Sequence, residues 1–545
     1  MTEDRQPAED EILQAHRTSF DRLVSVVQLR LERRRFDDAA ALAGVAAQYA
    51  WMHHPGCFTS PELEAVTQAL GAVINGDTPG RNGPLRGSQP PQRILHVFTE
   101  TPEAGGHTRL ATRWMTLDSN RVHSVVTTRQ RGEVPRELRT AAEASGGSVA
   151  TVHDDLGPLA AASRLAALAE NYDAVVLSIH PFDVVPSIAF SSRRQRPRVL
   201  FVNHADHVFW LGTSVADLVV CLRQSGHLIA RTRRGIDESR LVDLPIPLIL
   251  SQPRMTMEDA KQALGIAPDR VVLLSVASEY KFESRRPPGF LDLLVPVIEQ
   301  QKSTTLLAVG PTDAGLWHKA NKLTAGHIRA LGTLPDPALY RYAADIYLDS
   351  TPCASITSLL ESAALGTPCL AYVGGKDPGS PCVSDPPLVV DAILRAQDPA
   401  EYRRLLLRLI SEPEFRAEVG AGLASQVREA HSADRWLARL KQVYEQLGIL
   451  DRVERPAVVT TVFMTTDVDR EIVSLATGRH GPLAVAETLG SFRGELRSLK
   501  GQALFGRMLQ LGRVLLRRSP LPIRRRGNSS MPPRWWPLSD RFLAR

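Results

Sequence analysis

The feature that most constrains the fold is an alternation of short apolar runs with helical stretches, which begins at residue 93 and occurs in two sets. The first set of predicted strands is 94–99, 123–128, 174–179, 199–204 and 218–222. The second set is 271–278, 305–310, 328–332, 346–350 and 369–372. Strands that alternate with helices run parallel, and continuously apolar strands fit a sheet covered on both faces. The pattern therefore predicts two doubly wound α/β sheets in tandem.

Local composition divides the chain into five regions. The predicted regions are a helical N-terminal region over 1–76, a Gly/Pro-rich linker over 77–92, α/β domains over 93–250 and 251–450, and a basic tail over 451–545. A proline-rich stretch, 241–254, marks a hinge between the α/β domains, and helices are expected over 399–449. The N-terminal region shows a helical period from residue 9 onward. It either packs as a cap on the first α/β domain or binds a partner or the acceptor.

Composition excludes several classes of protein. The 545 residues are 43% apolar, which is enough for several packed domains. No run of about 18 apolar residues is present, so we expect no membrane-spanning helix. The acidic start lacks the apolar core of a signal peptide, so a cytoplasmic location is expected. Five cysteines without zinc-knuckle spacing argue against a disulfide framework or a structural zinc site.

The positive charge is concentrated in the tail. Residues 493–545 hold 13 Lys or Arg and two acidic residues, so this stretch carries +11 and the rest of the chain −5. An apolar stripe among basic residues predicts an amphipathic helix over 499–518. We expect residues 499–545 to attach peripherally to an anionic membrane surface. The alternative is a helix that docks on the protein itself, and nucleic acid is disfavoured because no recognition fold accompanies the charge.

Two candidate sites follow strands of the first α/β domain. Gly105, Gly106 and His107 form a turn between a strand and a helix, where a backbone can approach a ligand. The turn is not GxGxxG, which disfavours a nicotinamide dehydrogenase. His204 and Asp206 follow a later strand, and either could accept a proton from an attacking hydroxyl. Three close positions on a short loop seldom point at one ion, so we assign no metal site.

The second α/β domain carries the stronger candidate site. Lys281 follows the first strand of this domain, where a cation can neutralise a diphosphate. In the segment 348–368, a strand leads into a Ser/Thr-rich loop and a helix that begins near Thr357. Such a helix start suits a phosphate. Glu361 lies one turn further on, and its carboxylate could accept hydrogen bonds from ribose hydroxyls.

The tandem Rossmann-like halves, the turn GGHTR and the segment LDSTPCASITSLLESAALGTPCL resemble GT-B glycosyltransferases over roughly residues 93–450. The Tyr280-Lys281 pair and the spacing of Thr357 and Glu361 are most similar to the O-linked N-acetylglucosamine transferase branch. The GGH turn is also similar to glycosyltransferase family 4. That family carries a second glutamate eight positions before the one matched by Glu361, and Cys353 stands there in this chain. The departure puts the retaining chemistry of family 4 in doubt.

The resemblance implies an α/β GT-B fold in which two Rossmann-like domains face a cleft. It implies a hexosyl- or N-acetylhexosaminyltransferase that moves a sugar from a nucleoside-diphosphate sugar, most of all a UDP-sugar, to an acceptor hydroxyl without a metal or other cofactor. A sugar-nucleotide epimerase and a non-catalytic nucleotide-sugar-binding scaffold are the alternatives.

The resemblance also assigns roles to residues. Lys281 would contact the diphosphate and Glu361 the ribose. The distal phosphate would be met by Ser355, Ile356 and Thr357, while Gly105 and Gly106 would lie against the donor or the acceptor. If the reaction inverts configuration, the base is His204 or Asp206; if it retains configuration, no base is assigned.

Overall fold

The computed structural model describes most of the chain, and its residues form two compact units. The described ranges are 6–75, 90–102, 106–152, 157–191, 196–249, 255–284, 287–376, 379–380, 382–386, 388–450 and 461–475. Within these ranges, unit 1 takes residues 1–221, 226–242 and 440–545, and unit 2 takes residues 222–225 and 243–439. Most of the predicted linker lies outside the described residues, as do the predicted helix 499–518 and the membrane-binding stretch 499–545.

Unit 1 contains a seven-stranded sheet in the order β3-β2-β1-β4-β5-β6-β7. Its strands are β1 (Arg93–Phe98), β2 (Val122–Thr127), β3 (Val149–Thr151), β4 (Ala174–Ser178), β5 (Arg198–Asn203), β6 (Leu218–Cys221) and β7 (Leu241–Asp243). Neighbouring strands from β3 to β6 run parallel. The strand order changes direction between β1 and β4. In open α/β sheets, such a switch point is where ligands bind.

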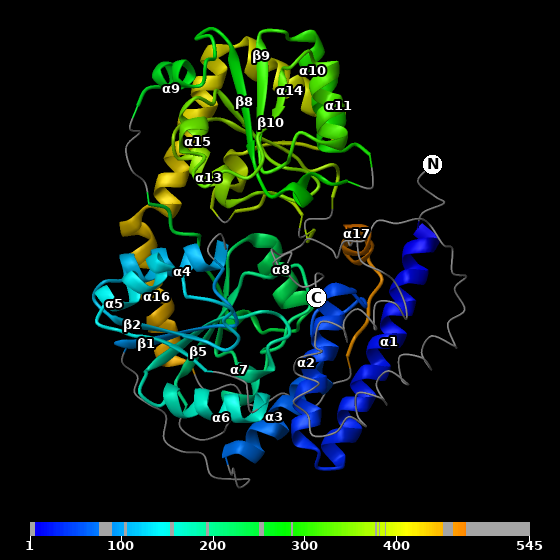
Figure 1. Ribbon diagram of the computed structural model, residues 1–545, viewed down its shortest axis with the longest axis vertical. Helices are drawn as coiled ribbons and strands as arrows, with labels where there is room; N and C mark the ends of the chain where they lie inside the picture. The colour runs from blue at the N-terminus through cyan, green and yellow to red at the C-terminus, as the bar shows by residue number, and fades with distance from the viewer. Residues whose placement is uncertain are drawn as a thin grey trace. The chain divides into compact units, whose positions relative to one another are not determined.

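Helices cover both faces of this sheet (Figure 1). They include α4 (Gly106–Leu117), α5 (Arg136–Ala144), α6 (Pro158–Ala169), α7 (Val184–Ala189) and α8 (Gln224–Thr232). On one face, Phe98 of β1 packs with Met115 of α4 and Leu138 of α5. On the other face, Leu95 and Val97 share a core with α6 and α7. Successive side chains of β1 point to opposite faces, so this strand needs apolar cover on both.

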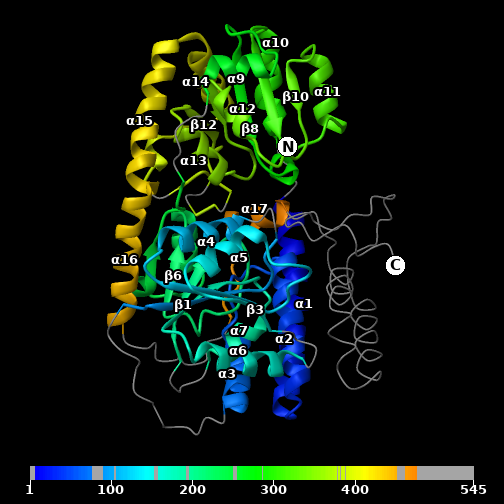
Figure 2. The same ribbon diagram turned by 60° about the vertical axis from the view of Figure 1, so that its left-hand side comes forward.

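The N-terminal region folds as α1 (Gln6–Glu32), α2 (Phe36–Met52) and α3 (Pro61–Asn75), which pack on unit 1. Helix α2 is buried over every residue from Asp38 to Ala50, as expected of an apolar helix surrounded by protein. Its Leu42 belongs to the same core as Leu95 of β1. Figure 2 shows α1 and α2 side by side. Of the two alternatives from the sequence, the structure shows the cap on the first α/β domain.

The segment 461–475 also packs on unit 1 and contains α17 (Asp467–Leu475). The buried carboxylate of Asp469 lies 2.8 Å from Nε2 of His54 and 2.7 Å from an Nη of Arg233. Burial raises the pKa of Asp469, but the hydrogen bonds and charges of these two partners outweigh it and lower the pKa. The sequence did not predict that this part of the chain docks on the N-terminal helices.

Unit 2 contains a six-stranded parallel sheet in the order β10-β9-β8-β11-β12-β13. Its strands are β8 (Val271–Val276), β9 (Thr304–Val309), β10 (Ile328–Ala330), β11 (Ile346–Leu348), β12 (Cys369–Tyr372) and β13 (Leu394–Ala396). The α-helices of unit 2 are α9 (Met257–Ala263), α10 (Phe290–Gln300), α11 (Gly315–Leu323), α12 (Ala338–Tyr342), α13 (Thr357–Ala363), α14 (Pro399–Ser411) and α15 (Pro413–His431). Helix α16 (Ala433–Ile449) begins in unit 2 and ends in unit 1. The switch point of this sheet lies between β8 and β11.

The predicted pair of parallel sheets covered by helices is confirmed. The sequence did not predict β3, β7 and β13, each of which has three residues. None of the helices in the described ranges has the length and apolar character needed to cross a membrane.

The end of α16 is fixed in unit 1 by buried hydrogen bonds. The hydroxyl of Tyr444 accepts from Nε1 of Trp114 at 2.9 Å and donates to Oδ2 of Asp118 at 2.9 Å. The guanidinium of Arg121 donates to Oδ1 of the same carboxylate at 2.6 Å. All four groups belong to unit 1, so this network fixes the end of α16 within that unit.

We expect Tyr444→Phe to lower the free energy of unfolding by about 1–3 kcal/mol, because the substitution removes the two buried hydrogen bonds that this hydroxyl makes with Trp114 and Asp118. Tyr402→Phe is the matched control, since the buried hydroxyl of Tyr402 has no hydrogen-bond partner among the described residues. This control should not lose stability. Urea unfolding followed by intrinsic fluorescence measures both variants, and equal losses would contradict the assigned role of Tyr444.

Candidate functional site

The predicted site residues that the structure describes lie in the loops and the first helical turns that follow the carboxyl ends of strands, around the two switch points. In unit 1, His107 follows β1 and His204 follows β5. In unit 2, Lys281 follows β8, and the loop 349–356 connects β11 to α13. Each unit therefore carries polar side chains where parallel α/β sheets bind ligands.

Lys281 lies in a short 3-10 helix, Glu279–Phe282, directly after β8. Its Nζ donates to the carbonyl of Ala354 at 2.7 Å, and its own carbonyl accepts from the amide of Cys353 at 3.4 Å. Burial lowers the pKa of Lys281, whereas Cys353 and Asp349 raise it. The amine is thus held beside the loop that follows β11, where its ammonium form can meet an anion.

Asp349, which the sequence analysis did not single out, organises that loop. Its Oδ1 accepts from the amide and hydroxyl of Ser355 at 2.8 and 2.6 Å and from the amide of Ser350 at 2.9 Å. Its Oδ2 accepts from the hydroxyl of Ser384. The hydroxyl of Ser355 also contacts that of Tyr347 at 2.6 Å. Ser355 therefore helps to shape the loop, and its contact with a phosphate stays a prediction. An acidic residue directly after a strand and before a Ser/Thr run was the available signal.

Thr357 is the first residue of α13, and Ile356 precedes it as the capping residue. Glu361 lies four residues after Thr357, so the two share one face of the helix. An Nη of Arg341 on α12 lies 2.6 Å from Oε2 of Glu361, and only 12% and 16% of the two side chains are exposed. The sequence did not predict Arg341, whose ion pair fixes the orientation of the Glu361 carboxylate.

Three histidines gather at the switch point of unit 1. Gly106 and His107 begin α4, whereas Gly105 lies outside the described residues. The ring of His107 stacks on that of His204, with centroids 5.2 Å apart, and meets the ring of His180 edge-on at 6.4 Å. His180 follows β4 and was missed, because a single histidine after a strand is not a recognisable motif.

Backbone carbonyls fix which ring nitrogen carries the proton in two of these histidines. Nδ1 of His204 lies 3.1 Å from the carbonyl of Val202, and Nε2 of His107 lies 3.1 Å from the carbonyl of Glu100. A carbonyl only accepts, so Nδ1 of His204 donates and its Nε2 bears the lone pair. Burial lowers the pKa of His204 to about 4 and that of His107 to about 3. The neutral imidazole of His204 therefore has the form of a general base near neutral pH.

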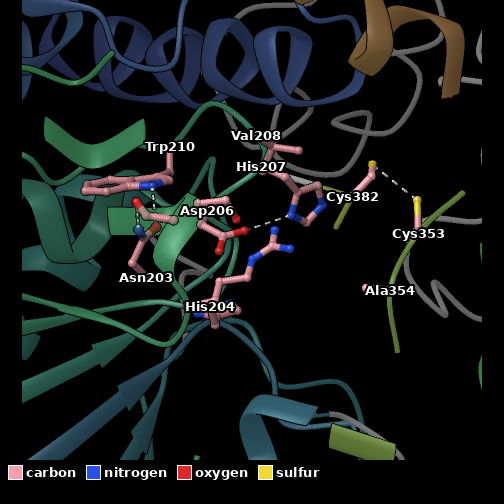
Figure 3. A network of polar contacts seen from close by, with 12 residues as sticks. Asn203, His204, Asp206, His207, Val208, Trp210, Cys353, Ala354 and Cys382 are labelled. Atoms are coloured by element: carbon pink, nitrogen blue, oxygen red, sulfur yellow. Dashed lines mark hydrogen bonds and ion pairs between the residues drawn. The ribbon is translucent and has the colours of Figure 1, made fainter. Parts of the chain in front are cut away.

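Asp206 is packed against α8 and is only 3% exposed. A Cβ on Gly226 of α8 would lie 2.5 Å from its Oδ2, so a larger residue there would displace the Asp206 side chain. Its Oδ1 faces Nδ1 of His207 (Figure 3), and the two atoms are 3.4 Å apart. Arg234 donates to the carbonyl of Asp206 at 3.0 Å. The charge of Asp206 raises the pKa of His204. Of the two candidate bases, we therefore assign the role of base to His204 and a positioning role to Asp206.

The comparisons with known proteins show the fold. No protein-family model and no curated protein matches the chain. A glycosyltransferase from Rickettsia africae matches with a TM-score of 0.51 and 12% identity, over 65% of this chain and 98% of that one. HepE from Anabaena in complex with UDP matches with a TM-score of 0.51 and 14% identity, over 66% of this chain and 100% of that one. An O-GlcNAc transferase from Thermobaculum terrenum gives a TM-score of 0.48 and 17% identity, over 80% and 82%.

The first two structures share the two-sheet α/β arrangement of GT-B glycosyltransferases with this chain. The predicted GT-B fold class is therefore confirmed.

Proposed function

We propose that this protein is a glycosyltransferase that moves a sugar from a nucleoside-diphosphate sugar to an acceptor hydroxyl. The observation that carries the proposal is the chemistry at the two switch points of a GT-B fold. Unit 2 presents Lys281 beside a loop ordered by Asp349. Unit 1 presents the neutral imidazole of His204. The UDP in the HepE structure supports a UDP-sugar as the donor.

Unit 2 binds the donor in this proposal. The Lys281 ammonium neutralises the diphosphate, which gains negative charge as it leaves, so the cation stabilises the transition state more than the ground state. The first turn of α13, at Ile356 and Thr357, meets the distal phosphate. Glu361 accepts hydrogen bonds from the ribose hydroxyls, with its carboxylate oriented by Arg341. None of these roles requires a metal ion.

Unit 1 supplies the base. As the acceptor oxygen attacks the anomeric carbon, its proton passes to Nε2 of His204, and the bond from that carbon to the diphosphate breaks. A single displacement of this kind inverts the configuration of the sugar. Cys353 supports inversion over retention, because it stands where family 4 enzymes carry the first of their two glutamates.

A panel of nucleotide sugars tests the proposal, with thermal shift to detect binding and diphosphate release to detect turnover. We expect a UDP-sugar to raise the melting temperature and UDP release to increase when an acceptor is added. Formation of an epimer without any acceptor would identify an epimerase instead. If no nucleotide or nucleotide sugar shifts the melting temperature, the transferase proposal is wrong and a scaffold role is favoured.

A further inference from the structure

Cys353 and Cys382 lie side by side in unit 2 (Figure 3), and the amide of Cys353 donates to the carbonyl of Lys281. Their Sγ atoms are 3.6 Å apart, and the two residues are buried, with 8% and 7% exposure. Both thiols are reduced in this structure. The sulfurs of a disulfide are about 2.05 Å apart, so these two atoms need to approach by only about 1.5 Å to form a bond.

The two loops that carry these cysteines are already in contact. The amide of Ala354 donates to the carbonyl of Cys382 at 3.1 Å. The hydroxyl of Ser384 donates to the carboxylate of Asp349, which orders the first loop. Because the loops are joined on both sides of the thiols, we expect a small movement of the loops, with the strands in place, to close the bond.

Lys281 provides the charge that favours thiol chemistry here. Burial lowers the pKa of Lys281, and Cys353 is the strongest of the groups that raise it, with Cys382 contributing less. The Lys281 amine is held at the residue next to Cys353, since its Nζ donates to the carbonyl of Ala354 at 2.7 Å, and a nearby cation favours a thiolate over a thiol. The thiolate is the nucleophile in thiol–disulfide exchange, which makes Cys353 the attacking residue.

We propose that Cys353 and Cys382 form a reversible disulfide that weakens donor binding. The thiolate of Cys353 attacks one sulfur of a small-molecule disulfide and releases one small thiolate. The thiolate of Cys382 then attacks the sulfur of Cys353 and releases the second small thiolate. The two cysteines lose two protons and two electrons, and the small disulfide is reduced to two thiols.

The effect on the donor rests on the proposed function. Closing the bond draws Cys353 toward Cys382 and shifts its neighbour Ala354, whose carbonyl receives the Nζ of Lys281. The loop that leads to the phosphate-binding turn of α13 is then held in a different position. The oxidised protein should therefore bind the donor more weakly than the reduced protein.

Peptide mapping of the full-length protein tests the disulfide. Trypsin cuts after Lys376, so the bond joins peptide 342–376, which holds Cys353 and Cys369, to peptide 377–395, which holds Cys382. After treatment with oxidised glutathione and alkylation, we expect the joined peptide, and dithiothreitol should remove it. Cys353→Ser and Cys382→Ser should each abolish it, whereas Cys369→Ser should keep it. Alkylation of both Cys353 and Cys382 after the oxidant would overturn the proposal.

Calorimetric titration with UDP tests the effect on binding. We expect the dissociation constant to be about tenfold higher for the oxidised than for the reduced protein, which equals about 1.4 kcal/mol. Cys382→Ser should give the same affinity with and without the oxidant. Equal UDP affinities of the oxidised and reduced unsubstituted protein would contradict the proposal that the disulfide weakens donor binding. Absence of UDP binding to the reduced protein would instead contradict the proposed function, while the peptide map still decides whether the disulfide forms.

Discussion

Replacing Lys281 with alanine should weaken UDP binding by about 10- to 100-fold, because a hydrogen bond to a charged group contributes about 1.5–3 kcal/mol. The side chain follows β8 at the switch point of unit 2, and its Nζ already contacts the loop after β11 at 2.7 Å. A diphosphate at this point would meet a cation that the fold has placed in advance. Isothermal titration of the full chain with UDP measures the change.

Two further variants complete this test. The first, at Lys376, distinguishes loss of the Lys281 charge from a change in the loop 349–356. Lys376 also supports this loop, since its Nζ donates to the carbonyl of Pro352 at 2.8 Å. Lys376→Ala should change the UDP affinity by no more than about twofold. Glu361→Ala should weaken binding by about 3- to 10-fold, as expected when a ribose loses a hydrogen-bond acceptor. If Lys281→Ala and Glu361→Ala both bind UDP as the unsubstituted protein does, the site assignment is wrong.

Replacing His204 with alanine should lower kcat by about 100- to 10,000-fold, the range for loss of a general base. The acceptor hydroxyl would then have no group to take its proton as the bond to the sugar forms. His207→Ala is the control, because His207 lies three residues further on in the same loop and contacts Asp206. Its kcat should stay within about twofold. A His204 variant that keeps full activity would argue for a retaining mechanism without this base.

The pH dependence of the rate follows from the lowered pKa of His204. Its folded pKa of about 4 means that the basic form is present above that pH and is lost as the pH falls through it. The rate should therefore be flat across neutral pH and decline on the acidic side. Asp206→Asn should move this decline to still lower pH, because the charge of Asp206 raises the pKa of His204. Circular dichroism at each pH separates this titration from unfolding. A decline centred near pH 6.5, the ordinary value for histidine, would contradict the assignment.

The sequence predicted the parts of the fold that depend on local pattern. The apolar runs at 94–99 and 271–278 became β1 and β8, because continuous apolar strands are buried on both faces. The loops that follow these strands could also be located, because parallel strands present their carboxyl ends at one edge of the sheet. The start of α13 at Thr357 was also readable from its Ser/Thr-rich approach.

The contacts that hold the site residues could not be read in the same way. Arg341 pairs with Glu361 from a neighbouring helix, and Cys382 approaches Cys353 from a separate loop. These partners are 20 and 29 positions apart, and no local period links them. His180 reached the ring of His107 only because β4 lies beside β1. Pairings of this kind depend on strand order, which pattern alone does not fix.

The buried helix α2 and the segment 461–475 determine which residues a fragment of this protein needs in order to fold stably. The amide of Thr461 donates to Glu62 at 2.8 Å, and Asp469 binds His54, so the late segment fastens the N-terminal helices in place. A fragment limited to 93–450, the part whose sequence resembles GT-B glycosyltransferases, would leave the α2 side of the first sheet in water. Recombinant fragments and domain exchanges should therefore keep residues 6–75 and 461–475, because the stable fold extends beyond the region that resembles a known fold.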